Sequence, residues 1–296
     1  MVVQTEIVEA LRTRVHALYA QIHEEYTPIW PAYVTEITGA ETVNKMDWFG
    51  AMPIMREVKG PIDIGKVHHH DYTITVGRQG VGILVELKML YHNRLDQVGL
   101  MLRDFFARTV TYEDRVCAQT LSAGFSTTCF DGQYFYDSDH SWGDSGTVSN
   151  VGTAAFSADD PTAYNVAWSA INTCPDEQGI PMGFVPTHLV VHPDLRDKTL
   201  RLLKAQTVKE GGTNVYAGDV QVIVTAHLST ATEWHLLACG RPVKPIVKMV
   251  EIPFSTATID DSELIAKNGY AEYYVTGAMQ PGYAHPGLAY GSTGVA

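Results

Sequence analysis

Apolar residues near the start of the chain recur at steps of three and four, the spacing that gathers side chains on one face of a helix. This pattern covers residues 5–23 and stops before Pro28 and Pro31, which a helix interior does not tolerate. We predict an amphipathic helical arm whose apolar stripe packs on a neighbouring subunit rather than in its own core. The stripe consists of Ile7, Leu11, Val15, Leu18 and Ile22.

Residues 48–90 show a different pattern, in which β-branched residues surround turns rich in glycine and proline. This pattern predicts a long two-stranded hairpin. Because such a ribbon buries too little surface to be stable alone, we expect it to lie on something else. One stretch of it is apolar and would be an exposed patch on a monomer, so we interpret it as a subunit interface. The residues concerned are Trp48, Phe49, Met52 and Met55.

The remaining patterns predict a mixture of helices and strands, an α+β fold. Residues 95–122 keep helical spacing without proline, and they form the longest helix we expect. A further helix should start at Asp160 as cap and Pro161 as first residue. Strands and helices then alternate up to about residue 239, which indicates a compact α/β lobe. The last segment is rich in strands, with proline and glycine breaks.

Composition excludes several classes of protein. With 296 residues and 45% hydrophobic content, the chain can bury a large core. Its 21 basic residues form no cluster and its net charge is -12, which argues against a protein that grips nucleic acid. Glu6 and Glu9 stand where a signal peptide would be basic and then apolar, and no apolar run is long enough for a membrane span. Only 18% of residues are charged, which hints at a surface covered by partners.

The sequence carries none of the main catalytic or cofactor motifs. Its four cysteines have no CxxC spacing, so we expect reduced, unpaired thiols. HExxH, GxSxG and Walker patterns are also missing from the sequence. We therefore predict no catalytic residues, no resident cofactor and no enzymatic activity.

One stretch, CFDGQYFYDSDHSW at residues 129–142, invites a metal-site hypothesis. Asp131, Asp137, Asp139 and His140 offer carboxylate and imidazole ligands that suit a divalent ion. Their spacing, however, does not follow the calcium-loop pattern. The alternative is a structural loop, in which Asp and Ser side chains cap turns while the aromatic residues are buried.

Several segments resemble the major head subunit of phage Mu and its prophage relatives, a family similar to the Hong Kong 97 (HK97) capsid fold. The segments are CFDGQYFYDSDH, GFVPTHLVVHPDLRDKTLRLL, LLACGRPVKPIVKMVE and GLAYGS. The resemblance runs from about residue 44 to the end, and it implies four structural parts. These are an N-terminal arm (1–43), an extended hairpin loop (44–90), a peripheral domain with a long spine helix (91–124 and 243–296) and an axial domain (125–242).

The resemblance also implies a function. Relatives are not known to use the DGQYFYDSDH segment in catalysis, so the family is not expected to be enzymatic. It implies a major capsid protein of a tailed bacteriophage or prophage that self-assembles into an icosahedral head around double-stranded DNA. Expected partners are further copies in hexamers and pentamers, a separate scaffolding protein, a portal and, as a further candidate, decoration proteins. The chain would occur in the virion, and in the host cytoplasm before assembly. Two alternatives stay open: a divalent-metal-dependent enzyme using the four residues above, and a non-viral compartment shell of the same fold.

Overall fold

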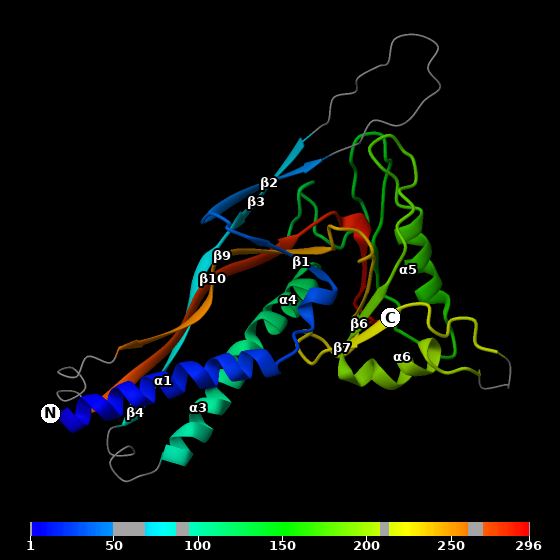
Figure 1. Cartoon of the computed structure of the whole chain (residues 1–296). Coiled ribbons are helices and arrows are strands. Elements are labelled where there is room, and N and C mark those ends of the chain that lie inside the picture. Colours follow the sequence, from blue (N-terminus) through cyan, green and yellow to red (C-terminus); the bar gives the residue numbers. More distant parts are fainter. Residues whose placement is uncertain (1, 50–68, 87–94, 208–212, 260–268, 296) are drawn as a thin grey trace.

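The computed structural model describes residues 2–49, 69–86, 95–207, 213–259 and 269–295. Helices lie along a long twisted sheet at one end of the molecule, and a second sheet with its own helices forms the other end (Figure 1). The helices are α1 (Val2–Glu25), α3 (Leu95–Val110), α4 (Tyr112–Ala123), α5 (Thr162–Asn172) and α6 (Arg196–Leu203), with short 3-10 turns η1 (Trp30–Ala32), η2 (Pro193–Leu195) and η3 (Pro286–Leu288).

The long sheet has the strand order β1-β9-β10-β4. Its strands are β1 (Val34–Thr38), β4 (Gly77–Glu86), β9 (Ile246–Ile259) and β10 (Tyr270–Tyr283). β9 and β10 form an antiparallel ribbon, β4 extends it on one side, and β1 joins the other side parallel to β9. Alternate residues of β10 are buried, which is the period expected of a strand with one covered face. Helices α1 and α3 supply that cover, and the helix expected over 5–23 is confirmed as α1.

The second sheet has the order β5-β11-β8-β6-β7, with α5 and α6 packed around it (Figure 1). Its strands are β5 (Val151–Gly152), β6 (His188–Val191), β7 (Gln221–Val224), β8 (Trp234–Leu237) and β11 (Ala289–Ser292). The alternating strands and helices predicted here are confirmed. The C-terminal strand differs from the expected division at residue 243. β11 was expected in the peripheral domain, but it pairs with β5 and β8 of the second sheet.

The long helix predicted over 95–122 is present but interrupted at Thr111, between α3 and α4. Three β-branched residues in a row, Thr109, Val110 and Thr111, favour helix least at this point. The hydroxyls of Thr109 and Thr111 donate back to the carbonyls of Phe106 and Arg108, at 2.8 and 3.1 Å. Such back-bonding competes with helical hydrogen bonds, which accounts for the break.

The predicted hairpin is present as an antiparallel pair, β2 (Val43–Phe49) and β3 (His69–Thr75). It is shorter than the range 44–90, because the chain leaves it after Thr75 and continues as β4 in the long sheet. At its base, Ile74 and Val76 are 4% and 3% exposed and belong to the main core. The ribbon is therefore anchored in its own chain at one end.

The apolar stripe of α1 also needs a correction. Val15 and Ile22 are 1% and 6% exposed, and they pack in the chain's own core with Phe106 of α3 and Val275 of β10. The expectation that the stripe packs on a neighbour rather than in its own core does not hold for these two residues. Periodicity identified the apolar face correctly, but it cannot tell which element covers that face.

The segment after α1 is fixed by Asp114 in the first turn of α4, a carboxylate that is only 4% exposed. Its Oδ1 accepts hydrogen bonds from the backbone N–H groups of Ile29 and Trp30, at 2.9 and 2.6 Å, and its Oδ2 accepts one from the Tyr26 hydroxyl. Burial and this hydrogen bond to Asp114 raise the pKa of Tyr26. A carboxylate with this many donors is well compensated for leaving water.

Lys248 of β9 makes a second connection beside the first. Its side chain is 1% exposed, and its Nζ lies 2.6 Å from Glu36 Oε2 and 2.9 Å from Glu113 Oε2. The same ammonium lies 3.3 Å from the centroid of the Trp30 ring. We call Glu36, Glu113, Asp114 and Lys248 the arm anchor, because together they join the segment after α1 to α4 and β9.

Replacing Lys248 by methionine should lower the free energy of unfolding by about 1–2 kcal/mol, because two partly exposed carboxylates lose the cation that they share. Urea unfolding followed by circular dichroism would measure this loss. The control Lys204→Met changes an exposed lysine at the end of α6 and should have little effect. Equal stability of both variants would contradict the role of Lys248.

Candidate functional site

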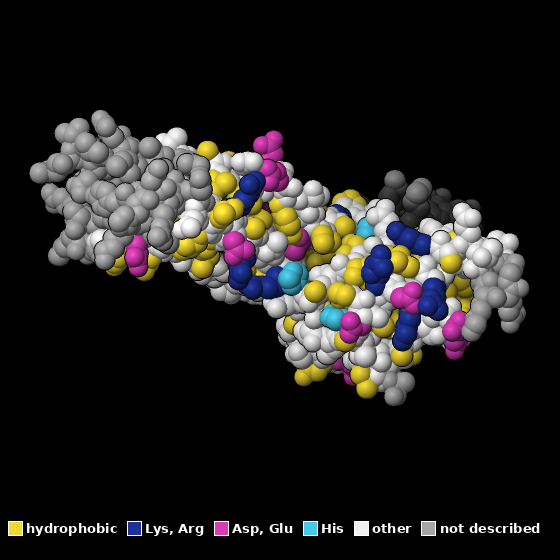
Figure 2. All heavy atoms as spheres, turned by 90° about the horizontal axis from the view of Figure 1, so that it is seen from below, with side chains coloured by type: hydrophobic (Ala, Val, Ile, Leu, Met, Phe, Trp, Pro, Cys, Tyr) yellow, Lys and Arg dark blue, Asp and Glu magenta, His cyan; other side chains and the backbone are white. Residues whose placement is uncertain are grey.

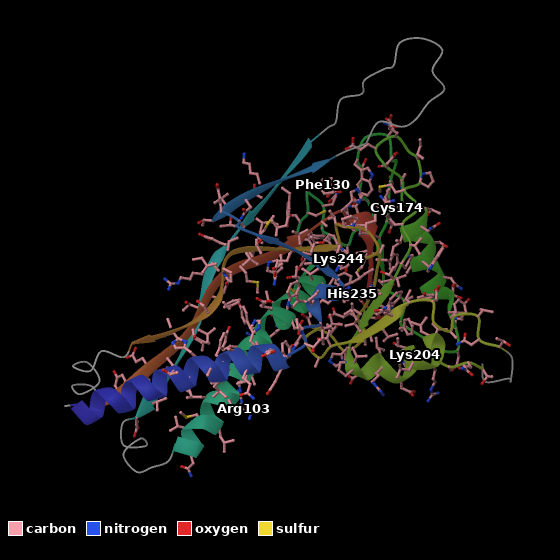
Figure 3. All side chains as sticks on the ribbon, in the orientation of Figure 1. Arg103, Phe130, Cys174, Lys204, His235 and Lys244 are labelled. Carbon is pink, nitrogen blue, oxygen red and sulfur yellow. The ribbon has the colours of Figure 1, made fainter. Side chains whose placement is uncertain are left out.

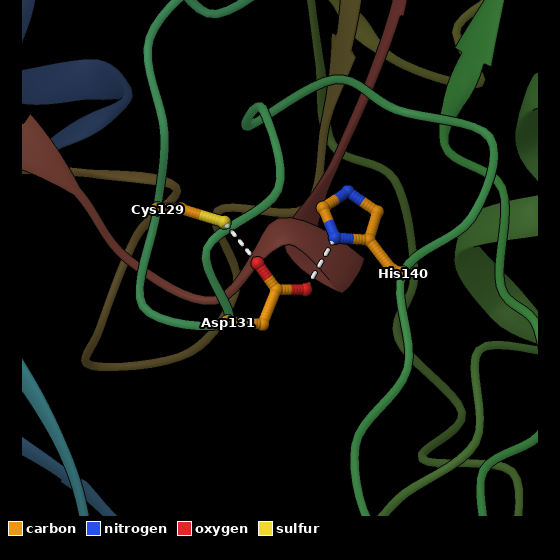
Figure 4. A group of neighbouring side chains, drawn as sticks. All are labelled: Cys129, Asp131 and His140. Carbon is orange, nitrogen blue, oxygen red and sulfur yellow. Dashed lines mark hydrogen bonds and ion pairs between the residues drawn. The ribbon is translucent and has the colours of Figure 1, made fainter.

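The stretch that invited a metal hypothesis forms a compact loop between α4 and β5, with three of its side chains in contact (Figure 4). Asp131 lies in the middle: its Oδ1 accepts from the Cys129 thiol at 3.1 Å, and its Oδ2 lies 2.6 Å from His140 Nδ1. Ligand atoms of the three residues lie within 4.8 Å of one another. The hypothesis thus placed Asp131 and His140 together correctly.

The other ring nitrogen of His140 faces Asn150. His140 Nε2 lies 3.2 Å from Asn150 Oδ1, which also accepts from the backbone N–H of Asp137. The amide orientation is well defined, since Asn150 Nδ2 donates to the carbonyls of Phe135 and Pro286, at 2.8 and 3.0 Å. Both nitrogens of this fully buried ring therefore face oxygen atoms. For both contacts to be hydrogen bonds, one proton must lie between His140 Nδ1 and Asp131 Oδ2, and another between His140 Nε2 and Asn150 Oδ1.

The electrostatics of Cys129 and Asp131 fit this hydrogen-bonded arrangement. Burial raises the pKa of the Asp131 carboxyl, but hydrogen bonds from His140 and Cys129 and the charge of His140 outweigh it, so the pKa lies below its usual value. Burial and the neighbouring Asp131 raise the pKa of the Cys129 thiol. A protonated, hydrogen-bonded thiol is a poor nucleophile and a poor metal ligand.

The remaining predicted ligands do not join the group. Asp139 is exposed, and Asp137 Oδ1 accepts from the backbone N–H of Ser138 at 2.7 Å, which is a turn contact. The four-residue metal site is therefore wrong as a set. The chemistry of Cys129, Asp131, His140 and Asn150 supports a structural staple that ties the loop to the C-terminal segment at Pro286.

A second buried polar group lies beside the staple, and no sequence pattern indicated it. His235 of β8 is 0% exposed; its Nδ1 lies 3.1 Å from the Tyr136 hydroxyl, and the two rings stack. Among the described residues, His235 Nε2 has no hydrogen-bond partner. Burial lowers the pKa of His235 to about 4, although the charge of Glu233 acts in the opposite direction. The imidazole is therefore neutral at pH 7.

The predicted intersubunit residues fall into three groups. Val15 and Ile22 are buried and Leu18 is half-buried within the chain. Ile7 and Leu11 lie on α1, and Trp48 and Phe49 on β2, but their side chains are outside the described residues, as are Met52 and Met55 entirely. For these six, contact with a neighbour stays a prediction.

The described surface nevertheless offers apolar area for association. Hydrophobic side chains lie between separate charged groups over the face shown in Figure 2. Several large ones are more than a third exposed, and four of them, Ile37, Val81, Leu84 and Ile252, belong to the long sheet. In the part of the chain described, no helix has the length and hydropathy of a membrane span.

Comparison with known families gives one match across most of the chain. A sequence model described as the Mu-like prophage major head subunit gpT matches residues 8–161 and 154–228. The major head subunit of the Mu-like prophage FluMu of Haemophilus influenzae is 25% identical over 148 residues. That alignment covers 50% of this chain and 47% of the relative, so it spans about half the length of each.

Comparison with solved structures shows the fold. The procapsid of bacteriophage JBD30 matches with a TM-score of 0.58 and 18% identity, over 97% of this chain and 75% of that chain. The JBD30 capsid decorated with minor capsid protein trimers matches with a TM-score of 0.60 and 19% identity, over 69% and 92%. The predicted HK97-like capsid fold is confirmed by these similarities.

If the Asp131 group is a staple, a chelator should leave the thermal midpoint unchanged, because the carboxylate already has its donors in the protein. Asp131→Asn should lower the midpoint, since it weakens the bond to His140. Differential scanning fluorimetry with and without EDTA would measure both effects. A drop of several degrees on adding EDTA to the unchanged chain would revive the metal-site hypothesis.

The buried neutral His235 predicts acid sensitivity. The unfolded chain binds a proton at this residue as the pH falls through about 6.5, whereas the fold resists until about pH 4. Relative to His235→Phe, the free energy of unfolding should fall by about 2 kcal/mol between pH 7 and pH 5, and not change above pH 7. Urea unfolding at both pH values would measure it. His23→Phe alters an exposed histidine and should show no comparable difference; equal pH dependence of His235→Phe and the unchanged chain would contradict the assignment.

Proposed function

The chain belongs to the Mu-like prophage major head subunit gpT family, and we propose that it is the major capsid protein of a tailed bacteriophage or prophage. In this role it self-assembles into the icosahedral head that encloses the double-stranded genome. The observation that carries the proposal is the family match over residues 8–161 and 154–228, on a chain of which 97% matches a procapsid protein.

The mechanism we propose is mechanical rather than catalytic. Many copies in hexamers and pentamers close a shell, and modest contacts are repeated over the whole lattice. A net charge of -12 suits a container that must not bind its packaged DNA tightly, because like charges repel. The protein would then occur in the virion, and in the host cytoplasm before assembly.

Further partners follow from the same proposal. A separate scaffolding protein would guide assembly, and a portal would occupy one vertex. The capsid of JBD30 carries minor capsid protein trimers, and decoration of this kind is a candidate for the present shell too. All of these contacts would be made by surfaces of the assembled shell rather than by a pocket in one subunit.

The two alternatives have less support. A metal-dependent enzyme would need Asp137 and Asp139 near His140, whereas one caps a turn and the other is exposed. The thiol and carboxylate that do approach His140 are occupied by hydrogen bonds to each other. A compartment shell would rest on the fold alone, while the family match favours a phage head.

The first turns of α1 and the range predicted as the extended hairpin supply the proposed intersubunit contacts. Ile7 and Leu11 continue the stripe of α1 beyond the part buried by α3, so we propose that they contact a neighbour. We propose the same for Trp48, Phe49, Met52 and Met55, which lie in the range predicted as the extended hairpin. Each apolar side chain of this size contributes roughly 1.5–3 kcal/mol when fully buried.

Expressed alone or with its scaffold, the purified chain should form closed particles visible by negative-stain electron microscopy. The variant Met52→Glu/Met55→Glu should remain folded by circular dichroism but lose the particles, because carboxylates would enter an apolar contact. The control Met52→Leu/Met55→Leu preserves the apolar character and should assemble. An unchanged chain that stays monomeric under both conditions would contradict the proposed function. Normal particles formed by the glutamate variant would show that Met52 and Met55 do not contribute to the interface.

A further inference from the structure

An open groove lies where β4 and β10 of the long sheet pass the junction between α3 and α4. It encloses roughly 500 Å³ and is lined by residues from all four elements and from β9. Its principal side chains are Arg78, Arg108 and Arg115, together with Phe105, Tyr112 and Phe254. Three arginines in one groove stand out in a chain with 33 acidic and only 21 basic residues.

The three guanidinium groups are placed so that they can still bind an anionic ligand. All three arginines are exposed. Arg108 pairs with Asp104 at 3.1 Å, but both side chains are largely in water, where such a pair contributes little. Arg115 lies 5.2 Å from the centroid of the Tyr112 ring. Among the described residues, no carboxylate lies within pairing distance of Arg78 or Arg115. A concave site with charges of one sign attracts the opposite charge.

The aromatic residues give the groove a second property. Phe254 and Tyr112 meet edge to face with their ring centroids 5.6 Å apart, and both are half-buried. Phe105 of α3 contributes another half-buried ring. A ligand for this groove should therefore combine carboxylates with apolar side chains, and arginine can bind each carboxylate with two parallel hydrogen bonds.

The sequence contains one segment with this composition. Residues 260–265 read Asp-Asp-Ser-Glu-Leu-Ile, and no other four consecutive residues of the chain hold three carboxylates. In the sequence the segment follows β9 and precedes β10, and both of these strands contribute residues to the groove. The apolar pair Leu264 and Ile265 directly follows the acidic residues, which matches the mixed lining.

We propose that the arginine groove of one copy binds residues 260–265 of a second copy. The inference rests on the proposed function, because it assigns one specific contact within a shell of identical chains. The contact is heterologous: the groove and the acidic segment are different surfaces, so each copy can offer both and the contacts can continue around a ring. Such a contact weakens with salt, since the charges lie at the surface.

Two charge-reversed chains test the proposal. In one, Arg78, Arg108 and Arg115 are replaced by Glu; in the other, Asp260, Asp261 and Glu263 are replaced by Lys. Each alone should associate at least about tenfold more weakly than the unchanged chain in sedimentation velocity, and an equimolar mixture should recover association, because each groove then meets a segment of opposite charge. The control Arg196→Glu/Lys198→Glu/Arg201→Glu reverses three charges on α6. Mixing this control with the chain that carries the three lysine changes should not restore association.

Two outcomes would overturn the proposal. If neither reversal weakens association, the groove is not an interface. If the mixture does not recover, but a single chain carrying both sets of changes does, the acidic segment binds the groove of its own chain. Circular dichroism checks that each variant folds; should the glutamate chain not fold, the Arg→Gln triple variant replaces it and should also weaken association.

A peptide experiment separates this inference from the proposed function. A fluorescein-labelled peptide of residues 259–267 is titrated at low salt with the chain that carries the lysine changes, so that its own segment cannot compete. Fluorescence anisotropy should show binding, which is lost when the groove arginines are also replaced. Peptide binding by the lysine-bearing chain, together with an unchanged chain that forms no particles, would leave the inference standing without the proposed function. Absence of peptide binding by the lysine-bearing chain, together with an unchanged chain that forms particles, would overturn the inference alone.

Discussion

The arrangement of the described chain depends on two buried charges, Asp114 and Lys248, where the segment after α1 crosses α4, and on the carboxylates that pair with Lys248. A buried carboxylate or ammonium is stable only when its partners surround it, so these residues fix one another in place. Asp114 binds the backbone at Ile29 and Trp30, and Lys248 lies between Glu36 and Glu113. Side chains of α4, β1 and β9 thus meet beside the backbone of η1. Figure 3 shows that side chains are crowded in the central region of the molecule.

The same principle explains the loop that resembles a metal site. Asp131, His140 and Asn150 are polar groups in an apolar neighbourhood, and each is satisfied by the next, ending at the carbonyl of Pro286. This staple holds the loop against the C-terminal segment, which in turn supplies β11 to the second sheet. A subunit held rigid in this way would suit the proposed shell, since small errors in shape would add up around a lattice of identical copies.

The sequence predicted the elements well and their partners less well. Periodicity located α1 and the interrupted helix α3–α4, and the alternation of residues 187–239 indicated the second lobe. Strand pairing is decided by distant residues, which is why β11 and β4 were assigned to the wrong parts. Lys248 looked like an ordinary charge on a strand, and only the fold brings Glu36 and Glu113 to it. Asp131 and His140 were found because they are near in sequence, but spacing could not show that they bond to each other and to Cys129 and Asn150.

Hydrogen exchange measured by mass spectrometry on Asp114→Asn tests the arm anchor most directly, with the exposed Asp104→Asn as control. The account predicts faster exchange in residues 26–38, because the backbone N–H groups keep only a neutral amide acceptor in place of the carboxylate and β1 loosens from β9, while β6 and β8 keep their protection. Asp104→Asn should leave exchange in all these segments unchanged. Unaltered protection of residues 26–38 in Asp114→Asn would contradict the claim that the anchor holds this segment to the body.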